Sequence, residues 1–273
     1  MFSVKKIGAA SLALATVFAL SACSGENTEK PNDSASPSSS SSDAAGDLKL
    51  VSAGTLTVCS NAPFAPFEYE GPDGSLTGID IDLTKLAAQD LGLEYKAVQY
   101  DFDAMSSGAA FAANACDVLA TGMTITEERL AKFSFSEPYY DANQGVMVSD
   151  GSTIAGLADL KGKKVGAQVD TTGKTESENA GLSVVEFPEV GSLIQAVATG
   201  QIDAAVADLG VLQSYVSEEL TIAYTLATNE QYGFGVAKEN TALAEALSKA
   251  VSEAKASGEY DKIITTHVGA AGN

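Results

Sequence analysis

The chain has 273 residues, a formal net charge of −20 and a single histidine, His267. A chain this acidic is repelled by phosphate backbones and anionic headgroups, which argues against nucleic acid as a partner. One histidine and three cysteines are a poor supply for zinc sites or for Ser-His and Cys-His catalysis, so we expect no metal and no cofactor. The partners we expect are small molecules and proteins.

Residues 1–22 predict an export signal. Lys5 and Lys6 precede an apolar run at 7–20, which is too short to cross a hydrocarbon core of ~30 Å. The order Leu-Ser-Ala-Cys at 20–23 is typical of bacterial lipoproteins, in which the cysteine takes a diacylglyceryl group and begins the mature chain. We therefore predict lipidation of Cys23; the alternative is an ordinary signal peptide with a stray cysteine.

Residues 23–47 predict a flexible tether. The segment is almost all Ser, Ala, Asp, Asn, Pro and Glu, with serine alone at 38–42. Such a sequence cannot bury a core, and its root-mean-square reach is roughly 25–30 Å. We therefore expect an exported protein that is anchored to the outer face of the cell membrane by its N-terminal lipid.

The first part of the folded chain alternates strands with helices. The expected elements are a strand at 56–59, a loop at 60–78, a helix from Ile79, a strand at 95–100, a helical stretch at 106–115 and a strand at 117–121. Asp80 or Asp82 can cap the first helix, and Gly92 suits the position after its end. This order predicts a parallel sheet covered by helices, with ligands at the carboxyl ends of its strands.

The same alternation starts again after residue 144. Strands are expected at 145–148, 164–168, 182–187, 204–207 and 233–237, and helices at 175–180, 192–199, 210–217 and 243–256. We predict an α/β fold of two lobes. Lobe 1 comprises residues 48–143 with 233–273, lobe 2 comprises residues 144–232, and the hinge lies near 141–145 and 229–232.

Cys59 and Cys116 remain in the exported part, where disulfides persist. A bond between them would stabilise the fold by up to ~4 kcal/mol. The alternative is a pair of buried thiols in neighbouring strands whose Cα atoms are too far apart to bond.

Five segments in one order resemble a known family. They are Asn-Ala-Pro-Phe-Ala-Pro-Phe-Glu at 61–68, Gly-Ile-Asp-Ile-Asp-Leu at 78–83, the segments at 116–129 and 133–140, and Gly-Glu-Tyr-Asp-Lys at 258–262. The chain resembles the extracellular solute-binding proteins of polar amino-acid ABC importers, which have the type II periplasmic-binding fold. The resemblance implies two lobes, each a mostly parallel sheet flanked by helices, joined by a two-strand hinge. They would close on one amino acid and present it to a membrane permease.

Arg129 is the residue we expect to bind the ligand carboxylate. Its planar guanidinium suits bidentate recognition, and Thr124 can add a short hydrogen bond. In the resembling family the arginine at this position has that role, and the carbonyl at the position of Gly122 accepts an ammonium proton. The alternative is a surface arginine that pairs with Glu127 or Glu128.

Asp208 follows an apolar strand and is expected to hold the α-ammonium group, because a buried carboxylate needs a cation. Its alternative role is a helix N-cap. Thr171 and Thr172 match a loop whose hydroxyl and N–H groups reach the ligand carboxylate in the family. Asp170 stands where the family usually has glycine, which leaves open which threonine makes that contact.

Asn61, Phe64, Phe102 and Gln168 align with the family's variable pocket wall and are expected to select the ligand side chain. Phe64 could cover a methylene chain or a cation, whereas a core role is the alternative for both phenylalanines. No second arginine is aligned with this wall, which disfavours an acidic side chain, although Lys174 keeps that option open. We favour a neutral polar or a cationic amino acid.

Two other classes compete with a binding protein. The same fold hosts exported dehydratases of the cyclohexadienyl or prephenate type, for which Glu68, Glu137 and Asp103 are available carboxylates. None of the three stands in a sequence context that suggests a paired acid and base. The other is the ligand-sensing subunit of a receptor. We expect a monomer that is not an enzyme.

Overall fold

The computed structural model describes residues 48–271, so the signal peptide, Cys23 and the tether lie outside the described residues. Lobe 1, as we use the term, is built on a five-stranded sheet of order β4-β1-β5-β12-β6. Its strands are β1 (Thr55–Ser60), β4 (Glu94–Gln99), β5 (Val118–Leu119), β6 (Ser134–Phe135) and β12 (Gly235–Val236). β1 is parallel to β4 and β5, whereas β12 is antiparallel to β5 and β6.

Lobe 2 is built on a second five-stranded sheet of order β11-β7-β10-β8-β9. Its strands are β7 (Tyr140–Ser149), β8 (Val165–Gln168), β9 (Val184–Phe187), β10 (Ala204–Asp208) and β11 (Leu220–Tyr232). β8, β9 and β10 run parallel, and β7 is antiparallel to both β10 and β11. The strands predicted at 145–148 and 204–207 lie within these bounds, whereas those predicted at 164–168 and 182–187 begin one and two residues before β8 and β9.

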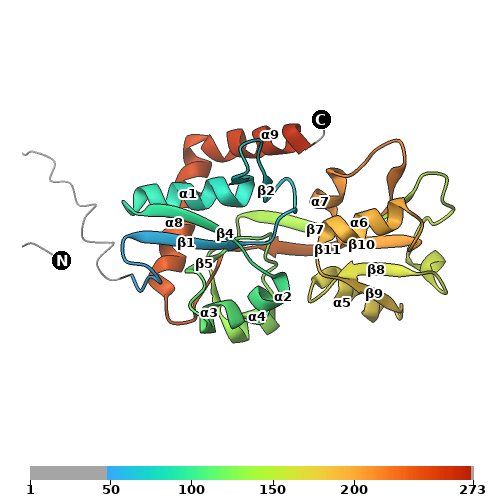
Figure 1. The fold of residues 1–273 in the computed structure, drawn as a ribbon, viewed down its shortest axis with the longest axis horizontal. Coiled ribbons are helices and arrows are strands. Elements are labelled where there is room, and N and C mark those ends of the chain that lie inside the picture. Colours follow the sequence, from blue (N-terminus) through green and yellow to red (C-terminus); the bar gives the residue numbers. More distant parts are fainter. Residues whose placement is uncertain (1–47, 272–273) are drawn as a thin grey trace, which may run out of the picture. The chain divides into compact units, whose positions relative to one another are not determined.

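Helices cover both faces of each sheet (Figure 1). In lobe 1, α1, α8 and α9 lie on one face and α2, α3 and α4 on the other (Figure 1). The helices are α1 (Ile79–Asp90), α2 (Phe102–Ser106), α3 (Ala109–Ala112), α4 (Glu127–Lys132), α5 (Thr172–Asn179), α6 (Val190–Ala198), α7 (Leu209–Gln213), α8 (Thr241–Ser257) and α9 (Glu259–Ala271), with a 3₁₀ turn at Leu157–Leu160. A hairpin of β2 (Tyr69–Glu70) and β3 (Leu76–Thr77) precedes α1.

β7 and β11 are the strands by which the chain leaves and re-enters lobe 1. They pair antiparallel from Tyr140 with Tyr232 to Ser149 with Leu220, and the register shifts between Leu226 and Glu230. The two segments predicted as hinge, 141–145 and 229–232, therefore lie opposite each other in one ladder. The lobe boundaries and the bending of this ladder stay predictions.

The prediction that Asp80 or Asp82 caps α1 was wrong. The N-cap is Gly78, which makes no side-chain cap bond, and its φ of 133° with Phe67 O only 2.1 Å from an added Cβ requires glycine. Asp80 points into the protein, where its carboxylate accepts hydrogen bonds from Gly122 N and Tyr139 Oη.

Two further expectations needed correction, and some elements were not predicted. The helical stretch predicted at 106–115 starts earlier, at Phe102, and is divided into α2 and α3, because Gly108 between them has a φ of 81°. The helix predicted at 210–217 ends at Gln213, its last turn replaced by a loop that leads to β11. Most of β11 and all of α4 and α9 were not predicted, because β11 has many exposed polar residues and α4 is very short.

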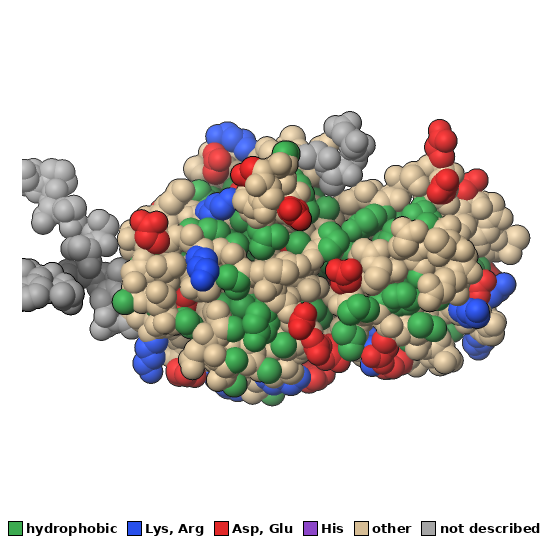
Figure 2. Space-filling model, in the orientation of Figure 1, with side chains coloured by type: hydrophobic (Ala, Val, Ile, Leu, Met, Phe, Trp, Pro, Cys, Tyr) green, Lys and Arg blue, Asp and Glu red, His purple; other side chains and the backbone are tan. Residues whose placement is uncertain are grey.

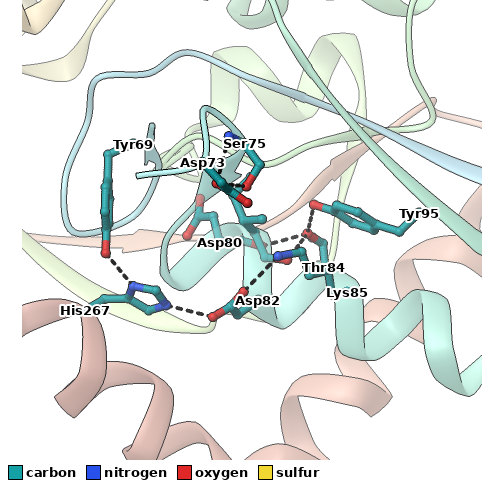
Figure 3. Close-up of polar contacts among 10 residues, drawn as sticks. Tyr69, Asp73, Ser75, Asp80, Asp82, Thr84, Lys85, Tyr95 and His267 are labelled. Carbon is teal, nitrogen blue, oxygen red and sulfur yellow. Dashed lines mark hydrogen bonds and ion pairs between the residues drawn. The ribbon is translucent and has the colours of Figure 1, made fainter. Parts of the chain in front are cut away.

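His267 fastens α9 to the rest of lobe 1 (Figure 3). Its Nδ1 lies 2.9 Å from Tyr69 Oη, and its Nε2 lies 2.7 Å from Asp82 Oδ2. Asp82 also accepts a hydrogen bond of 3.2 Å from Lys85 Nζ. The C-terminal helix is thus tied to α1 and to the hairpin through one buried imidazole.

Cys59 and Cys116 form a disulfide in the structure, with Cα atoms 5.7 Å apart. Cys59 lies on β1 and Cys116 just before β5, its parallel neighbour. Both side chains are buried in a small apolar cluster with Phe102 and Met105. The alternative, two buried thiols that are too far apart to bond, therefore does not hold in this structure.

The described surface carries charges of both signs. Figure 2 shows acidic and basic side chains interspersed over the face that it presents. Between residues 48 and 271, no helix is long and apolar enough to cross a membrane. The same residues contain no group of three or more His, Cys, Asp or Glu side chains that could hold a metal ion.

Candidate functional site

One small cavity between the sheets brings together every residue predicted to bind ligand. Its lining is Asn61, Phe64, Phe102, Thr121, Gly122, Thr124, Arg129, Gln168, Thr171, Thr172 and Asp208. These residues lie at or beyond the carboxyl ends of strands such as β1, β5, β8 and β10, where α/β sheets bind ligands. Only Thr121 had not been named in advance.

Arg129 forms the cationic side of this cavity. Thr126 caps α4 by accepting a hydrogen bond from Arg129 N, and Arg129 is 5% exposed. Nη1 donates to Thr124 O and Nη2 to Asp170 O, each at 2.9 Å. Burial lowers the pKa of Arg129, and the nearby carboxylate of Asp208 raises it; the group keeps its charge.

The surface pairing considered for Arg129 is not present, since Glu128 pairs instead with Lys132 at 2.8 Å. Arg129 Cζ lies 5.4 Å from the centre of the Phe102 ring, within the range of a cation–π contact. Phe64 packs against Gly122, where an added Cβ would come within 2.5 Å of Phe64 Cε1. The two phenylalanines therefore belong to the core and line the cavity at once.

Asp208 forms the anionic side. It ends β10 and precedes α7, yet its side chain makes no cap hydrogen bond, so the N-cap alternative is not used. Its Oδ1 accepts a hydrogen bond of 3.1 Å from Gln144 Nε2. Burial and the neighbouring charge of Glu230 raise the pKa of Asp208 to about 7. A cation placed beside this carboxylate would lower that pKa again.

The two threonines at the start of α5 already have protein partners. Thr171 Oγ1 donates to Gln168 O at 2.7 Å and accepts from Lys174 N as the N-cap. Thr172 Oγ1 accepts from Gln144 Nε2 at 3.2 Å. Asp170 has a φ of 56°, the left-handed conformation that glycine adopts most easily. The loop thus keeps the backbone that a glycine at this position would favour.

A direct contact joins the two lobes across the cavity. Gln168 Nε2 donates to Asn61 Oδ1 at 2.9 Å and to Pro188 O at 3.1 Å, while Asn61 Nδ2 donates to Tyr100 O. The cavity measures only about 10 Å³, room for about one water molecule. Side chains or whole lobes must therefore move before an amino acid can be bound here.

Lys174, which kept an acidic ligand open, does not line the cavity. Its Nζ lies 3.0 Å from Glu186 and 3.6 Å from Glu178, in a neighbouring pocket that shares Arg129, Thr171 and Thr172 with the cavity. Arg129 is therefore the one cation among the residues that line this described cavity.

Gln144 and Glu230 lie directly behind the lining and were missed by sequence reasoning. Gln144 is fully buried on β7, and its Nε2 reaches Asp208, Thr172 and Glu230. Gln144 directly precedes the predicted apolar strand at 145–148, and this position is a signal that could have identified it. Glu230 stands among polar residues of β11 and carries no such signal.

Two buried acids lie behind the loop that contains Gly122. Glu68 Oε1 accepts a hydrogen bond from Thr121 Oγ1, whereas Oε2 is buried without a partner. Burial and then the charge of Asp80 raise the pKa of Glu68 well above its usual value. Burial raises the pKa of Asp80 to about 7. The folded protein therefore binds protons that the unfolded chain releases near pH 4.

Because both pKa values are raised on folding, this pair stabilises the fold at low pH and loses that effect as pH rises toward and beyond 7. We expect Glu68→Gln to raise the free energy of unfolding at pH 8 by on the order of 1 kcal/mol and to give no gain at pH 4. Urea unfolding at the two pH values measures this difference. Glu137→Gln changes an exposed acid of the same lobe and serves as the control; an equal effect of Glu68→Gln at both pH values would contradict the expectation.

The chain belongs to the bacterial extracellular solute-binding proteins, family 3, which it matches over residues 56–270. It is 31% identical over 275 residues to the probable histidine-binding protein of Neisseria gonorrhoeae, covering 96% of this chain and 94% of that protein. Its fold is similar to that of an ancestral arginine-binding protein bound to arginine, with TM-score 0.73, 38% identity and coverage of 78% of this chain and 98% of that one. It is also similar to the amino acid ABC transporter substrate-binding protein AbpA of Streptococcus pneumoniae bound to L-arginine, with TM-score 0.75, 32% identity and coverage of 81% and 97%.

Family and fold agree with the site. The chain is an exported solute-binding protein of the kind that serves amino-acid ABC importers, with the two-lobed periplasmic-binding fold. It is a transport protein and not an enzyme, so the dehydratase alternative is set aside.

Proposed function

We propose that this protein captures one amino acid between its lobes and delivers it to the permease subunits of an ABC importer. In this proposal the mature chain is a monomer held at the outer face of the membrane by a lipid on Cys23. The observation that carries the proposal is the cavity in which a buried guanidinium, Arg129, and a buried carboxylate, Asp208, both take part. Charges of opposite sign in one small cavity suit a zwitterion.

In the proposed binding mode the ligand carboxylate lies against Arg129. Two of the five N–H donors of the guanidinium are used by Thr124 O and Asp170 O, which leaves three for a ligand. The ammonium group lies against Asp208 and the carbonyl of Gly122. Thr124, Thr171 and Thr172 complete the contacts through backbone N–H groups or by exchanging their present hydroxyl partners.

The ligand side chain is proposed to meet Asn61, Gln168, Phe64 and Phe102. Two amides and two aromatic faces suit a neutral polar or a cationic side chain. The position of Lys174 outside the cavity weakens the case for an acidic one. Relatives and structural neighbours named for histidine and arginine support the same choice.

Binding is proposed to close lobe 1 (48–143 with 233–273) onto lobe 2 (144–232) by bending where β7 and β11 pair. The ligand favours the closed form only because it binds that form better. The hydrogen bond between Asn61 and Gln168 supports this, because it joins the lobes at the ligand cavity.

A thermal-shift screen tests the proposal. The mature chain with Cys23→Ser is denatured, refolded without ligand and screened against the twenty amino acids plus citrulline, ornithine and cystine. A ligand at 100 times its Kd stabilises the fold by ~2.7 kcal/mol, several degrees for a protein of this size. One small group of related hits is expected. A folded protein that responds to none of them would contradict amino-acid binding.

Affinity is expected to fall at acid pH. Asp208 must be ionised to hold the ammonium group, and its pKa is raised to about 7 by burial and the charge of Glu230. Below that value each pH unit costs up to about tenfold in affinity, because the carboxyl group must first lose its proton. Calorimetric titration between pH 5 and 8 measures the slope. Asp208→Asn is expected to bind weakly and with little pH dependence over this range; a wild-type Kd that is constant from pH 5 to 8 would refute this role of Asp208.

A further inference from the structure

A second carboxylate, Glu230, lies behind Asp208 on the same amide group. Gln144 Nε2 is 2.7 Å from Glu230 Oε2, 3.1 Å from Asp208 Oδ1 and 3.2 Å from Thr172 Oγ1. Glu230 comes from β11 and Asp208 from β10, so two strands of one sheet bring the acids together around a glutamine of β7, the strand between them. The amide nitrogen has two hydrogens for three acceptors.

The orientation of the Gln144 amide is fixed by these acids. Its Oε1 is buried without a hydrogen-bond partner and lies beside Gly173, where an added Cβ would be 2.8 Å away. Turning the amide by 180° would place that oxygen against the carboxylates of Asp208 and Glu230, which is repulsive. The side-chain carbonyl of Gln144 thus stays unpaired, while its amide nitrogen donates to both Asp208 and Glu230.

The charges of the cavity lining and of the acids around Gln144 do not balance. Lys132 and Lys174 of a second adjoining pocket do not change this, because each is paired with a glutamate. Arg129 is the one cation in the described lining, and Asp208 and Glu230 both interact with it electrostatically. With both carboxylates ionised, the three groups carry a net charge of −1. Glu176 of α5 also faces Glu230 and adds a negative charge on this side. A pocket of about 550 Å³ that contains Glu230 and Glu176 adjoins the cavity and shares Thr124 and Thr172 with it.

We propose that Glu230 is a specificity-determining residue that makes the site prefer ligands of positive net charge. The inference rests on the proposed amino-acid binding and deepens it by assigning the ligand class. Glu230 does not line the cavity; it acts through Gln144 and through the field in a partly desolvated site. A neutral zwitterion leaves the local charge at −1, a cationic amino acid brings it to zero, and an acidic one brings it to −2.

The size of the effect follows from Coulomb's law. Unit charges roughly 12 Å apart at an effective dielectric constant between about 20 and 40 alter an affinity by about three- to tenfold. Removal of the Glu230 charge is expected to change the ratio of affinities within a pair of near-isosteric ligands by that factor. The α-carboxylate and α-ammonium contacts are common to both members of such a pair and cancel.

The test uses two ligand pairs, arginine with citrulline and glutamine with glutamate, titrated calorimetrically into wild-type protein and Glu230→Gln. For each pair that binds, the preference for the more positive member is expected to fall about three- to tenfold in Glu230→Gln. Glu230→Asp keeps the charge and is expected to keep the ratio even where both affinities drop. Glu219→Gln removes an exposed charge just before β11 and is expected to leave the ratio unchanged.

Ratios in Glu230→Gln within twofold of the wild type would overturn the proposal. Glu230→Ala provides a second neutral variant if Glu230→Gln does not refold. Ratios within twofold of the wild type in Glu230→Ala would equally overturn the proposal. Wild-type protein that binds neither pair but responds to another amino acid in the screen would refute the inference and leave amino-acid binding intact. No response to any amino acid would remove the proposed function and the inference together.

Discussion

Replacing Arg129 with alanine is expected to weaken amino-acid binding by about 2–5 kcal/mol, roughly 30-fold to several-thousandfold. Much of this loss is the cost of leaving a ligand carboxylate buried without its partner. The loss is expected in the dissociation rate, since truncating a buried charged partner changes dissociation more than capture. Calorimetry gives the affinity, and stopped-flow fluorescence of a label near the cavity gives the two rates.

Two further variants separate recognition from folding. Arg129→Lys keeps the charge but loses the planar fork, so its affinity is expected to lie between those of the wild type and Arg129→Ala. Lys132→Ala removes an exposed cation from the same helix and is expected to bind normally. Arg129 also holds Thr124 O and Asp170 O, so the free energy of unfolding is measured for each variant. Wild-type affinity in a folded Arg129→Ala protein would exclude this residue from the ligand site.

Loss of the Cys59–Cys116 bond is expected to be the largest change in stability. The two cysteines are 57 residues apart in sequence, and a cross-link closing such a loop stabilises the fold by about 4 kcal/mol in the chain-entropy model. We expect Cys59→Ala with Cys116→Ala to lower the free energy of unfolding by about 2–4 kcal/mol. Urea unfolding of the wild type with and without reductant gives an independent value for the same bond.

The double variant provides the control, because reductant is expected to have no effect on it. Thiol titration of unfolded, unreduced protein is a second check, with no reactive thiol expected when Cys23 is replaced. Two reactive thiols per chain would show that the bond is absent from the purified protein. A wild-type unfolding curve that does not change with reductant would argue that it contributes nothing.

The ligand cavity was accessible from the sequence because its residues follow strands. Gly122 and Asp208 come at or after apolar segments that predict strands, and the carboxyl ends of such strands gather at one edge of a sheet. The resemblance then assigned roles to particular positions, such as Arg129. Local pattern and family position agree here, so all ten predicted ligand residues line one cavity.

Residues that act through tertiary contacts were not accessible in the same way. An aspartate at a helix start predicts a cap, yet Asp80 is turned inward by Gly122 N and Tyr139 Oη, which lie far away in sequence. Glu230 is a polar, partly buried residue on a strand of mixed exposure, and only its approach to Gln144 gives it significance. The depth of a carboxylate depends on packing from other elements, which a single sequence does not specify.

The two crossings between the lobes have a consequence for the order of folding. Strand β12, the neighbour that joins β6 to β5, is made only after all of lobe 2. Lobe 2 is one continuous stretch and can fold as a unit, whereas β5 keeps an unpaired edge until residues 235–236 have emerged. Most of the chain must therefore be synthesised and exported before β12 can complete the sheet of lobe 1, whose first strands are made earliest. That sheet is completed last.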